Sequence, residues 1–327
     1  MGSLAENIGK SLSKLQVVEL HPYFGAEISG VDVSKPIPND VFEDILALSA
    51  KYGVLVFRAT DLDDSSHIKL ARRFGPILNM SQVLAGQKTR LGTYELADLS
   101  NVDIETGEPV AVKGPNDRIA SFLHADLAYS QQRASWSLLR AYEIPPLGYG
   151  GDTIFADTRK AFEDLNEIEL GLKEKLLSKN YVGAHSWQHS QKTSNPDIFK
   201  DLDPSAYPMA KHPLVELHKP SNRMNLYIGV YLHHIEGATD QEDEIVGLQH
   251  TLLQHATKSK YQLNVEWRNP GDLVIWDNRH VKTVEGGVLD NNYVTDFFGR
   301  TVMHKAGPRI HAGKFKRDLR RATVLEV

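Results

Sequence analysis

The irregular order of its short apolar segments limits the fold of this chain more than any other feature. Runs typical of strands lie at 15–20, 54–57, 136–144 and 152–156, and helical patterns separate only some of them. Doubly wound parallel sheets need strands and helices in regular alternation, which this order lacks. Short central strands with helices outside them favour a mainly β fold with a double-stranded β-helix (jelly-roll) core and flanking helices.

Helical periodicity and turn-forming residues give the remaining boundaries. We expect helices at 38–52, 65–74, 158–168 and 239–257, strands within 24–34, 226–229 and 314–324, and a hairpin from Asn264 to Trp276. Residues 1–14 are polar and are expected to be flexible. Because no repeat or low-complexity linker follows, we expect residues 15–327 to form one domain.

Composition narrows the function classes. The net charge of −5 at pH 7 gives no basic footprint for nucleic acid, and no apolar run approaches the roughly 18 residues of a membrane span. The N-terminal residues lack a signal-peptide pattern, so we expect a soluble cytoplasmic protein. With no cysteine, a bound metal must use the 14 histidines and the carboxylates. Association into a homo-oligomer is left open.

His124 and Asp126 are the first candidate metal ligands. Side chains two residues apart on a strand point the same way, so this imidazole and this carboxylate could hold one ion from one side. A histidine from elsewhere would complete a two-His-one-carboxylate face, which suits non-haem Fe(II) in oxygenases. By itself a His-x-Asp triplet is weakly specific, because many such triplets are surface residues.

Further stretches give this pair a context. They are 150–157 (Gly-Gly-Asp-Thr-Ile-Phe-Ala-Asp), 269–279 (which ends Trp-Asp-Asn-Arg), and 302–307 (Val-Met-His-Lys-Ala-Gly) followed by the arginine-rich 316–323. In this order, and together with 124–130, they resemble the TauD/TfdA family of Fe(II)- and 2-oxoglutarate-dependent dioxygenases over roughly residues 15–324. Within this family, the sequences of these motifs most resemble the TfdA-like branch.

The resemblance implies specific roles. Fe(II) would be held by His124, Asp126 and a distal histidine, and 2-oxoglutarate by Thr153 and Arg317. Arg321 would bind a carboxylate on the substrate. With O2, the enzyme would oxidise a small anionic substrate and release succinate and CO2. Hydroxylation, dealkylation, desaturation and ring closure all remain open as outcomes.

Each of these residues could also have an ordinary structural role. Threonine favours strands, so Thr153 could be a plain strand residue, and Arg317 or Arg321 could form solvated ion pairs. A buried carboxylate is best matched by the planar fork of arginine, which favours the ligand role for Arg317. Trp276 and the following Asp-Asn pair are expected to be structural, forming the turn before the distal histidine.

The distal histidine departs from the family pattern. The family places it seven residues after the tryptophan, where this chain has Thr283; His280 comes four residues after Trp276. We favour His304, because Arg317 and Arg321 follow it at a distance that a short loop and a returning strand can span. The extra stretch 281–301 is then expected to be an inserted loop.

Two alternatives remain from the residues alone. The chain could be a metal-binding jelly roll without turnover, for which the extra stretch is the main support. It could also be a zinc hydrolase that uses the same ligand face, which would leave Thr153 and Arg317 without a role.

Overall fold

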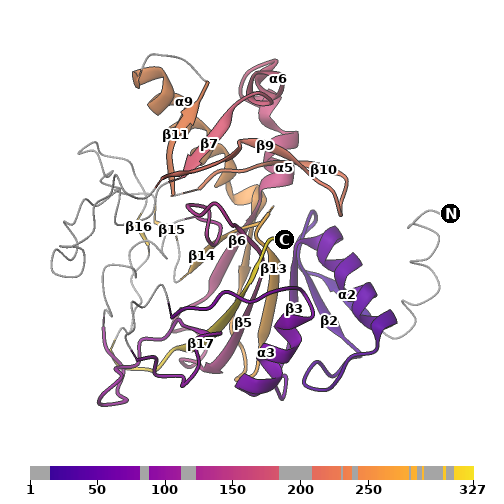
Figure 1. Ribbon diagram of the computed structural model, residues 1–327, viewed down its shortest axis with the longest axis vertical. Coiled ribbons are helices and arrows are strands. Elements are labelled where there is room, and N and C mark those ends of the chain that lie inside the picture. The colour runs from indigo at the N-terminus through magenta and orange to yellow at the C-terminus, as the bar shows by residue number, and fades with distance from the viewer. Residues whose placement is uncertain are drawn as a thin grey trace.

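The computed structural model describes most of the chain. The described residues are 15–81, 88–111, 123–183, 208–229, 231–237, 242–279, 281–285, 289–290, 305–306 and 313–327. The architecture is mainly β with few helices (Figure 1).

A seven-stranded sheet forms the centre of the molecule, with strand order β1-β2-β3-β13-β5-β17-β4. Its neighbours pair antiparallel except β2 with β3, which are parallel. Its strands are β1 (Gln16–Glu19), β2 (Ala26–Ser29), β3 (Val54–Phe57), β4 (Ala97–Asp98), β5 (Ala134–Glu143), β13 (Leu273–Asp277) and β17 (Asp318–Leu325). Apolar runs in the sequence predicted β1, β3 and β5, whereas β4 was not predicted.

A three-stranded sheet lies against the inner face of the large one. It contains β12 (Gln262–Val265), β6 (Thr153–Asp157) and β14 (Val281–Glu285) in that order. Trp276 of β13 and Phe155 of β6 meet between the sheets, with ring centroids 5.4 Å apart. Side chains of β3, β5, β12 and β17 complete this core. Two facing sheets of this kind are consistent with the predicted jelly-roll core.

Helices α2 (Asn39–Tyr52) and α3 (Asp64–Arg72) cover the outer face of the large sheet (Figure 1). Side chains alternate along each strand, so Leu273 and Ile275 of β13 pack in the core beneath these helices. Val274 and Trp276 pack in the core between the sheets instead. This alternation decides which residues of β5, β13 and β17 reach the candidate site.

A second group of elements lies beside the sheets, at the top of Figure 1, and shares its own core. It consists of α5 (Thr158–Glu163), α6 (Leu172–Leu176), α9 (Glu242–Ala256), β7 (Asn180–Gly183), β8 (Ala210–Pro213), β9 (Val215–His218), β10 (Arg223–Leu226) and β11 (Leu232–Glu236), with 3₁₀ turns at Leu165–Glu167 and Ser259–Tyr261. The short strands β15 (Leu289–Asp290) and β16 (Lys305–Ala306) pair with each other.

The predicted hairpin from Asn264 to Trp276 is wrong. Strand β12 pairs with β6, whereas strand β13 pairs with β3 and β5. The turn between β12 and β13 therefore crosses from one sheet to the other. Asp272 fixes that crossing, because its carboxylate accepts hydrogen bonds from the backbone N–H of Ala59 and from Arg58 at the end of β3.

Other boundaries also shift. Asp157, rather than Thr158, caps α5 by accepting the N–H of Arg159, and the helix ends at Glu163, short of the predicted 168. The strand expected at 226–229 instead ends at Leu226. The segment expected to be an inserted loop, 281–301, begins with β14, which pairs antiparallel with β6.

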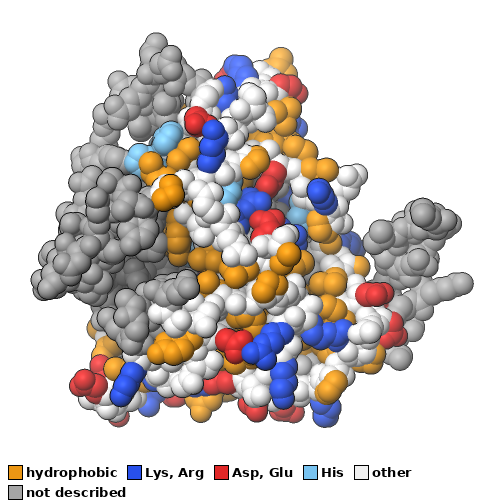
Figure 2. Space-filling model, viewed as in Figure 1, with side chains coloured by type: hydrophobic (Ala, Val, Ile, Leu, Met, Phe, Trp, Pro, Cys, Tyr) orange, Lys and Arg blue, Asp and Glu red, His pale blue; other side chains and the backbone are white. Residues whose placement is uncertain are grey.

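The surface carries both acidic and basic side chains, as expected from the similar numbers of the two in the sequence. Over the described residues, no helix is long and apolar enough to cross a membrane. Figure 2 shows acidic and basic side chains interspersed on this face among the residues that the structure describes.

Candidate active site

His124 and Asp126 meet at the inner face of the large sheet. Nε2 of His124 lies 3.9 Å from Oδ1 of Asp126, and the two residues are only 5% and 4% exposed. The local backbone differs from the predicted strand: Asp126 opens a turn, and Leu127 after it has a positive φ of 55°. The two side chains nevertheless present a nitrogen and an oxygen to the same space.

Two glycines let the segment around this pair pack closely on its surroundings. A Cβ on Gly229 would lie 3.1 Å from the carbonyl oxygen of Leu123 and 3.2 Å from Cα of His124. A Cβ on Gly183 would lie 2.5 Å from the carbonyl oxygen of Ala128. Any side chain at these positions therefore pushes on the backbone that carries the candidate ligands.

Gly183→Ala is expected to destabilise the protein by about 1–3 kcal/mol, the usual cost of overpacking a filled site. Gly247→Ala is the matched control, because a Cβ there meets nothing within 4 Å and Gly247 lies inside α9. It should stabilise by about 0.5–1 kcal/mol through the helix preference for alanine. Urea unfolding of both variants measures the difference, and equal effects would contradict the close packing at Gly183.

Arg321 of β17 reaches the same place. Its Nη1 lies 2.7 Å from Asp126 Oδ1, with both side chains mostly buried. Arg317 lies four residues earlier, just before β17 begins, and a register shift between Asp318 and Leu319 separates it from the regular alternation of the strand. The intervening Arg320 pairs instead with Asp318 and with Asp64 at the start of α3. The adjacent residues Arg320 and Arg321 therefore have different partners, Asp64 and Asp318 for the first and Asp126 for the second.

Arg317 and Thr153 are brought together through Gly151. Arg317 Nε donates to the carbonyl oxygen of Gly151 at 2.9 Å, two residues before Thr153. Gly151 has φ 91°, and a Cβ on it would lie 3.1 Å from Cδ of Arg317, so both backbone and space require glycine. The buried Thr153 hydroxyl accepts the indole N–H of Trp267 at 3.2 Å.

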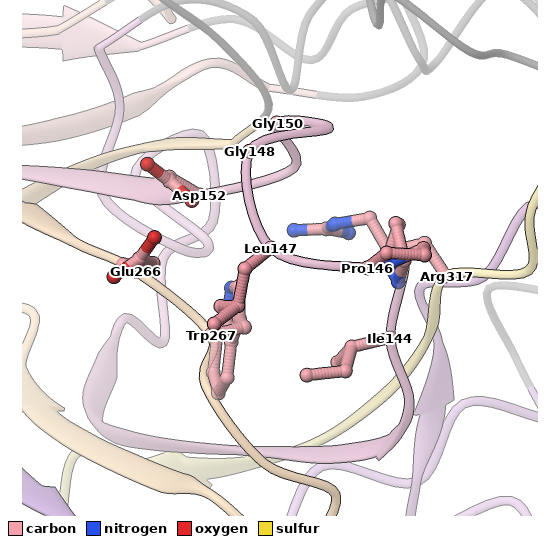
Figure 3. Close-up of a pocket in the computed structure, with 10 residues that line it drawn as sticks. Ile144, Pro146, Leu147, Gly148, Gly150, Asp152, Glu266, Trp267 and Arg317 are labelled. Carbon is pink, nitrogen blue, oxygen red and sulfur yellow. The ribbon is translucent and has the colours of Figure 1, made fainter.

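A small pocket adjoins this arrangement. Figure 3 shows Arg317 and Trp267 among its lining residues, together with the loop that carries Leu147 and Gly148. His124 and Asp126 are not part of its wall. The pocket therefore lies on the Arg317 side of the site, away from the candidate metal ligands.

Two tyrosines that the sequence did not single out stand beside the candidate ligands. The ring of Tyr231 meets His124 edge-on at 6.0 Å and Tyr129 at 4.8 Å. Burial raises the pKa of Tyr129 to about 12, and the negative charge of Asp126 adds to the shift. Tyr129 follows Asp126 closely in the His-x-Asp stretch, which could have indicated it, whereas no local signal marks Tyr231.

The third predicted metal ligand is a distal histidine. His304 and His280 both lie outside the described residues. Within the described part of the chain, no third histidine, aspartate or glutamate joins His124 and Asp126 in a metal-binding group. The structure thus brings together three of the six predicted site residues, Asp126 with His124 and Arg321, and places a fourth, Arg317, beside the segment that carries Thr153.

The comparisons with known proteins identify the class. Residues 16–281 match the family described as "Taurine catabolism dioxygenase TauD, TfdA family". The chain is 30% identical over 311 residues to the alpha-ketoglutarate-dependent 2,4-dichlorophenoxyacetate dioxygenase of Cupriavidus pinatubonensis (strain JMP 134 / LMG 1197), covering 94% of this chain and 96% of the relative. It is 27% identical to the alpha-ketoglutarate-dependent sulfate ester dioxygenase of Pseudomonas putida, covering 80% of this chain and 82% of the relative.

A solved structure shares the fold. The crystal structure of AAD-2 in complex with Mn(II) and N-oxalylglycine superposes with a TM-score of 0.72 at 24% identity, and the match covers 95% of this chain and 98% of that one. This chain belongs to the TauD/TfdA family. It is an Fe(II)- and 2-oxoglutarate-dependent dioxygenase that uses O2, which sets aside the hydrolase and non-catalytic alternatives.

Proposed function

We propose that this enzyme oxidises a C–H bond of a small substrate that carries a carboxylate or a similar anion, with release of succinate and CO2. The observation that carries the proposal is the ion pair between Arg321 and Asp126, 2.7 Å long and next to His124. It sets a cation that can receive an anionic substrate directly beside the candidate metal ligands. The core that supports it is proposed to be a double-stranded β-helix.

The residues present fit a divalent metal. An imidazole nitrogen and a carboxylate oxygen lie close enough to bind one ion, and both are buried where few waters compete. Fe(II) bound there would supply the activation of O2 that the family reaction needs. We propose His304 as the third ligand, with the remainder of 281–301 after β14 as an inserted loop.

The residues also fit 2-oxoglutarate. Arg317 offers a planar guanidinium in a mostly buried position, where a charge-assisted pair with a carboxylate is stronger than in water. Thr153 offers a hydroxyl on the neighbouring strand β6. We propose that these two groups hold the carboxylate of the cosubstrate that lies farther from the metal.

The substrate class follows from the charge and walls of the site. Arg321 supplies the positive charge, and the rings of Tyr129 and Tyr231 supply an apolar wall beside His124. Relatives are named for an aryloxyacetate and for sulfate esters, which share an anionic group on an organic body. We propose the same general shape for the substrate of this chain.

An anaerobic titration tests the proposed function. Adding Fe(II) and then 2-oxoglutarate to the purified protein should produce a weak visible charge-transfer band. Under air, succinate release should rise with one or more members of a panel of aryloxyacetates, alkyl sulfates and sulfonates. A protein that gives no band and no succinate with any of them would not be an oxygenase of this kind.

Arg321→Ala should weaken substrate affinity by about 10- to 150-fold, equivalent to roughly 1.5–3 kcal/mol for a hydrogen bond to a charged group. Turnover of 2-oxoglutarate without substrate should persist, because Arg317 is unchanged. Arg268→Ala is the control, since the Arg268 side chain is half exposed and pairs with Glu266 on the surface. Equal use of a neutral amide analogue by the wild type would contradict anion selection.

A further inference from the structure

A chain of hydrogen bonds runs from the core to the Asp126 carboxylate. Ser137 of β5 donates its hydroxyl to Asp126 Oδ2 at 2.6 Å, and Asn278 donates its amide Nδ2 to Ser137 Oγ at 2.8 Å. Asn278 Oδ1 accepts the backbone N–H of Asp126 at 3.1 Å and the indole N–H of Trp276 at 3.0 Å. All four residues are buried.

The direction of every bond in this chain is fixed by chemistry. An indole N–H and a backbone N–H can only donate, so the amide of Asn278 must turn its oxygen toward them. Its nitrogen, which can only donate, then faces Ser137. Ser137 must therefore use its single hydroxyl proton toward Asp126 Oδ2.

This direction settles which oxygen of Asp126 is held by the core and which one faces the candidate site. Oδ2 is engaged by the Ser137 hydroxyl in the core, whereas Oδ1 faces the site, 3.9 Å from Nε2 of His124 and 2.7 Å from Nη1 of Arg321. The same amide of Asn278 also holds the backbone of Asp126, so the side chain and main chain of the ligand are fixed by one group. Rotation of the carboxylate about its own axis would break the bond to Ser137.

We propose that Asn278 and Ser137 are positioning residues that orient Asp126 so that Oδ1 is presented to the metal. The inference rests on Asp126 being a metal ligand, as proposed above. It gives the Trp-Asp-Asn stretch a role beyond the structural turn that the sequence suggested. Partners of this kind typically change metal affinity 10- to 100-fold when they are removed.

Mn(II) binding, followed by the loss of the free-ion EPR signal, provides the test. Ser137→Ala should weaken Mn(II) affinity by about 10- to 100-fold. Ser135→Ala is the matched control: Ser135 is also buried on β5, two residues away, but its hydroxyl bonds to the carbonyl oxygens of Val324 and Leu325. It should leave Mn(II) affinity within about twofold, and thermal melting should show that the variants fold.

Asn278→Asp tests the direction of the chain at constant size. A carboxylate at 278 can only accept, so it should draw the Ser137 proton away from Asp126 and weaken Mn(II) binding. Simple attraction by the added negative charge would tighten binding instead. The double variant should be no weaker than the more affected single variant, because both break the same chain.

The visible band of the Fe(II)–2-oxoglutarate complex gives a second readout. It should shift in Ser137→Ala and in Asn278→Asp but not in Ser135→Ala. Wild-type Mn(II) affinity in Ser137→Ala, or tighter binding in Asn278→Asp, would overturn the positioning role. If Ser137→Ala fails to fold, the near-isosteric Asn278→Asp decides alone. A wild type that binds no Mn(II) would instead contradict the metal site itself.

Discussion

Asp126→Ala should abolish Mn(II) and Fe(II) binding and, with them, succinate release. Asp126 supplies the only carboxylate beside His124 among the described residues, and hard divalent iron needs an oxygen ligand in a mixed set. Since loss of an outer partner alone typically costs 10- to 100-fold in metal affinity, loss of the ligand should exceed about 100-fold. Mn(II) titration and succinate assays measure both effects.

A second substitution separates the ligand role from stability. Removing the Asp126 side chain leaves the mostly buried guanidinium of Arg321 without its carboxylate, which can destabilise by about 3–5 kcal/mol. Asp126→Asn keeps the size and an acceptor for Ser137 while removing the charge, so it should fold and still bind Mn(II) poorly. Unchanged turnover in either variant would remove the central assignment.

The Mn(II) titration also distinguishes His304 from His280 as the distal metal ligand. His304→Ala should lose Mn(II) as Asp126→Ala does, whereas His280→Ala should bind normally. We favour His304 because Arg317 and Arg321 follow it at a distance that a short loop and a returning strand can span. Loss of metal in the His280 variant alone would transfer the assignment to His280.

Arg317→Ala should raise the 2-oxoglutarate requirement by roughly 30- to several-thousand-fold and leave Mn(II) affinity nearly intact. The guanidinium is buried beside Gly151, and truncating one partner of a buried charge pair typically costs about 2–5 kcal/mol. Arg317→Lys keeps the charge but loses the planar fork, so its effect should be intermediate. The dependence of succinate release on 2-oxoglutarate concentration gives the measurement.

Lys316→Ala is the neighbouring control for this experiment. Lys316 precedes β17 and is partly exposed, whereas Arg317 is buried with its backbone N–H bonded to Asn101. The control should leave both the 2-oxoglutarate dependence and the Mn(II) affinity unchanged. A large effect on metal binding in Arg317→Ala would mean that the arginine stabilises the ligand segment rather than the cosubstrate.

The sequence by itself indicated several of the central strands and the chemical groups proposed for the site. Buried strands such as Val54–Phe57 carry apolar residues on both faces, and such an apolar run can be recognised in the sequence alone. The two-residue spacing of His124 and Asp126 and the four-residue spacing of Arg317 and Arg321 each predicted a shared face. The structure places His124 and Arg321 at Asp126, although the backbone after Asp126 is a turn.

Only the tertiary structure decided which strands pair and which groups touch Asp126. Periodicity reports burial along one segment, not its partner, so β12 and β13 looked like a hairpin although they belong to different sheets. The contacts of Asp126 come from Ser137, Asn278 and Arg321, and Asn278 is 152 residues away in sequence. Such contacts depend on the closure of long loops around a shared core, which no local pattern encodes.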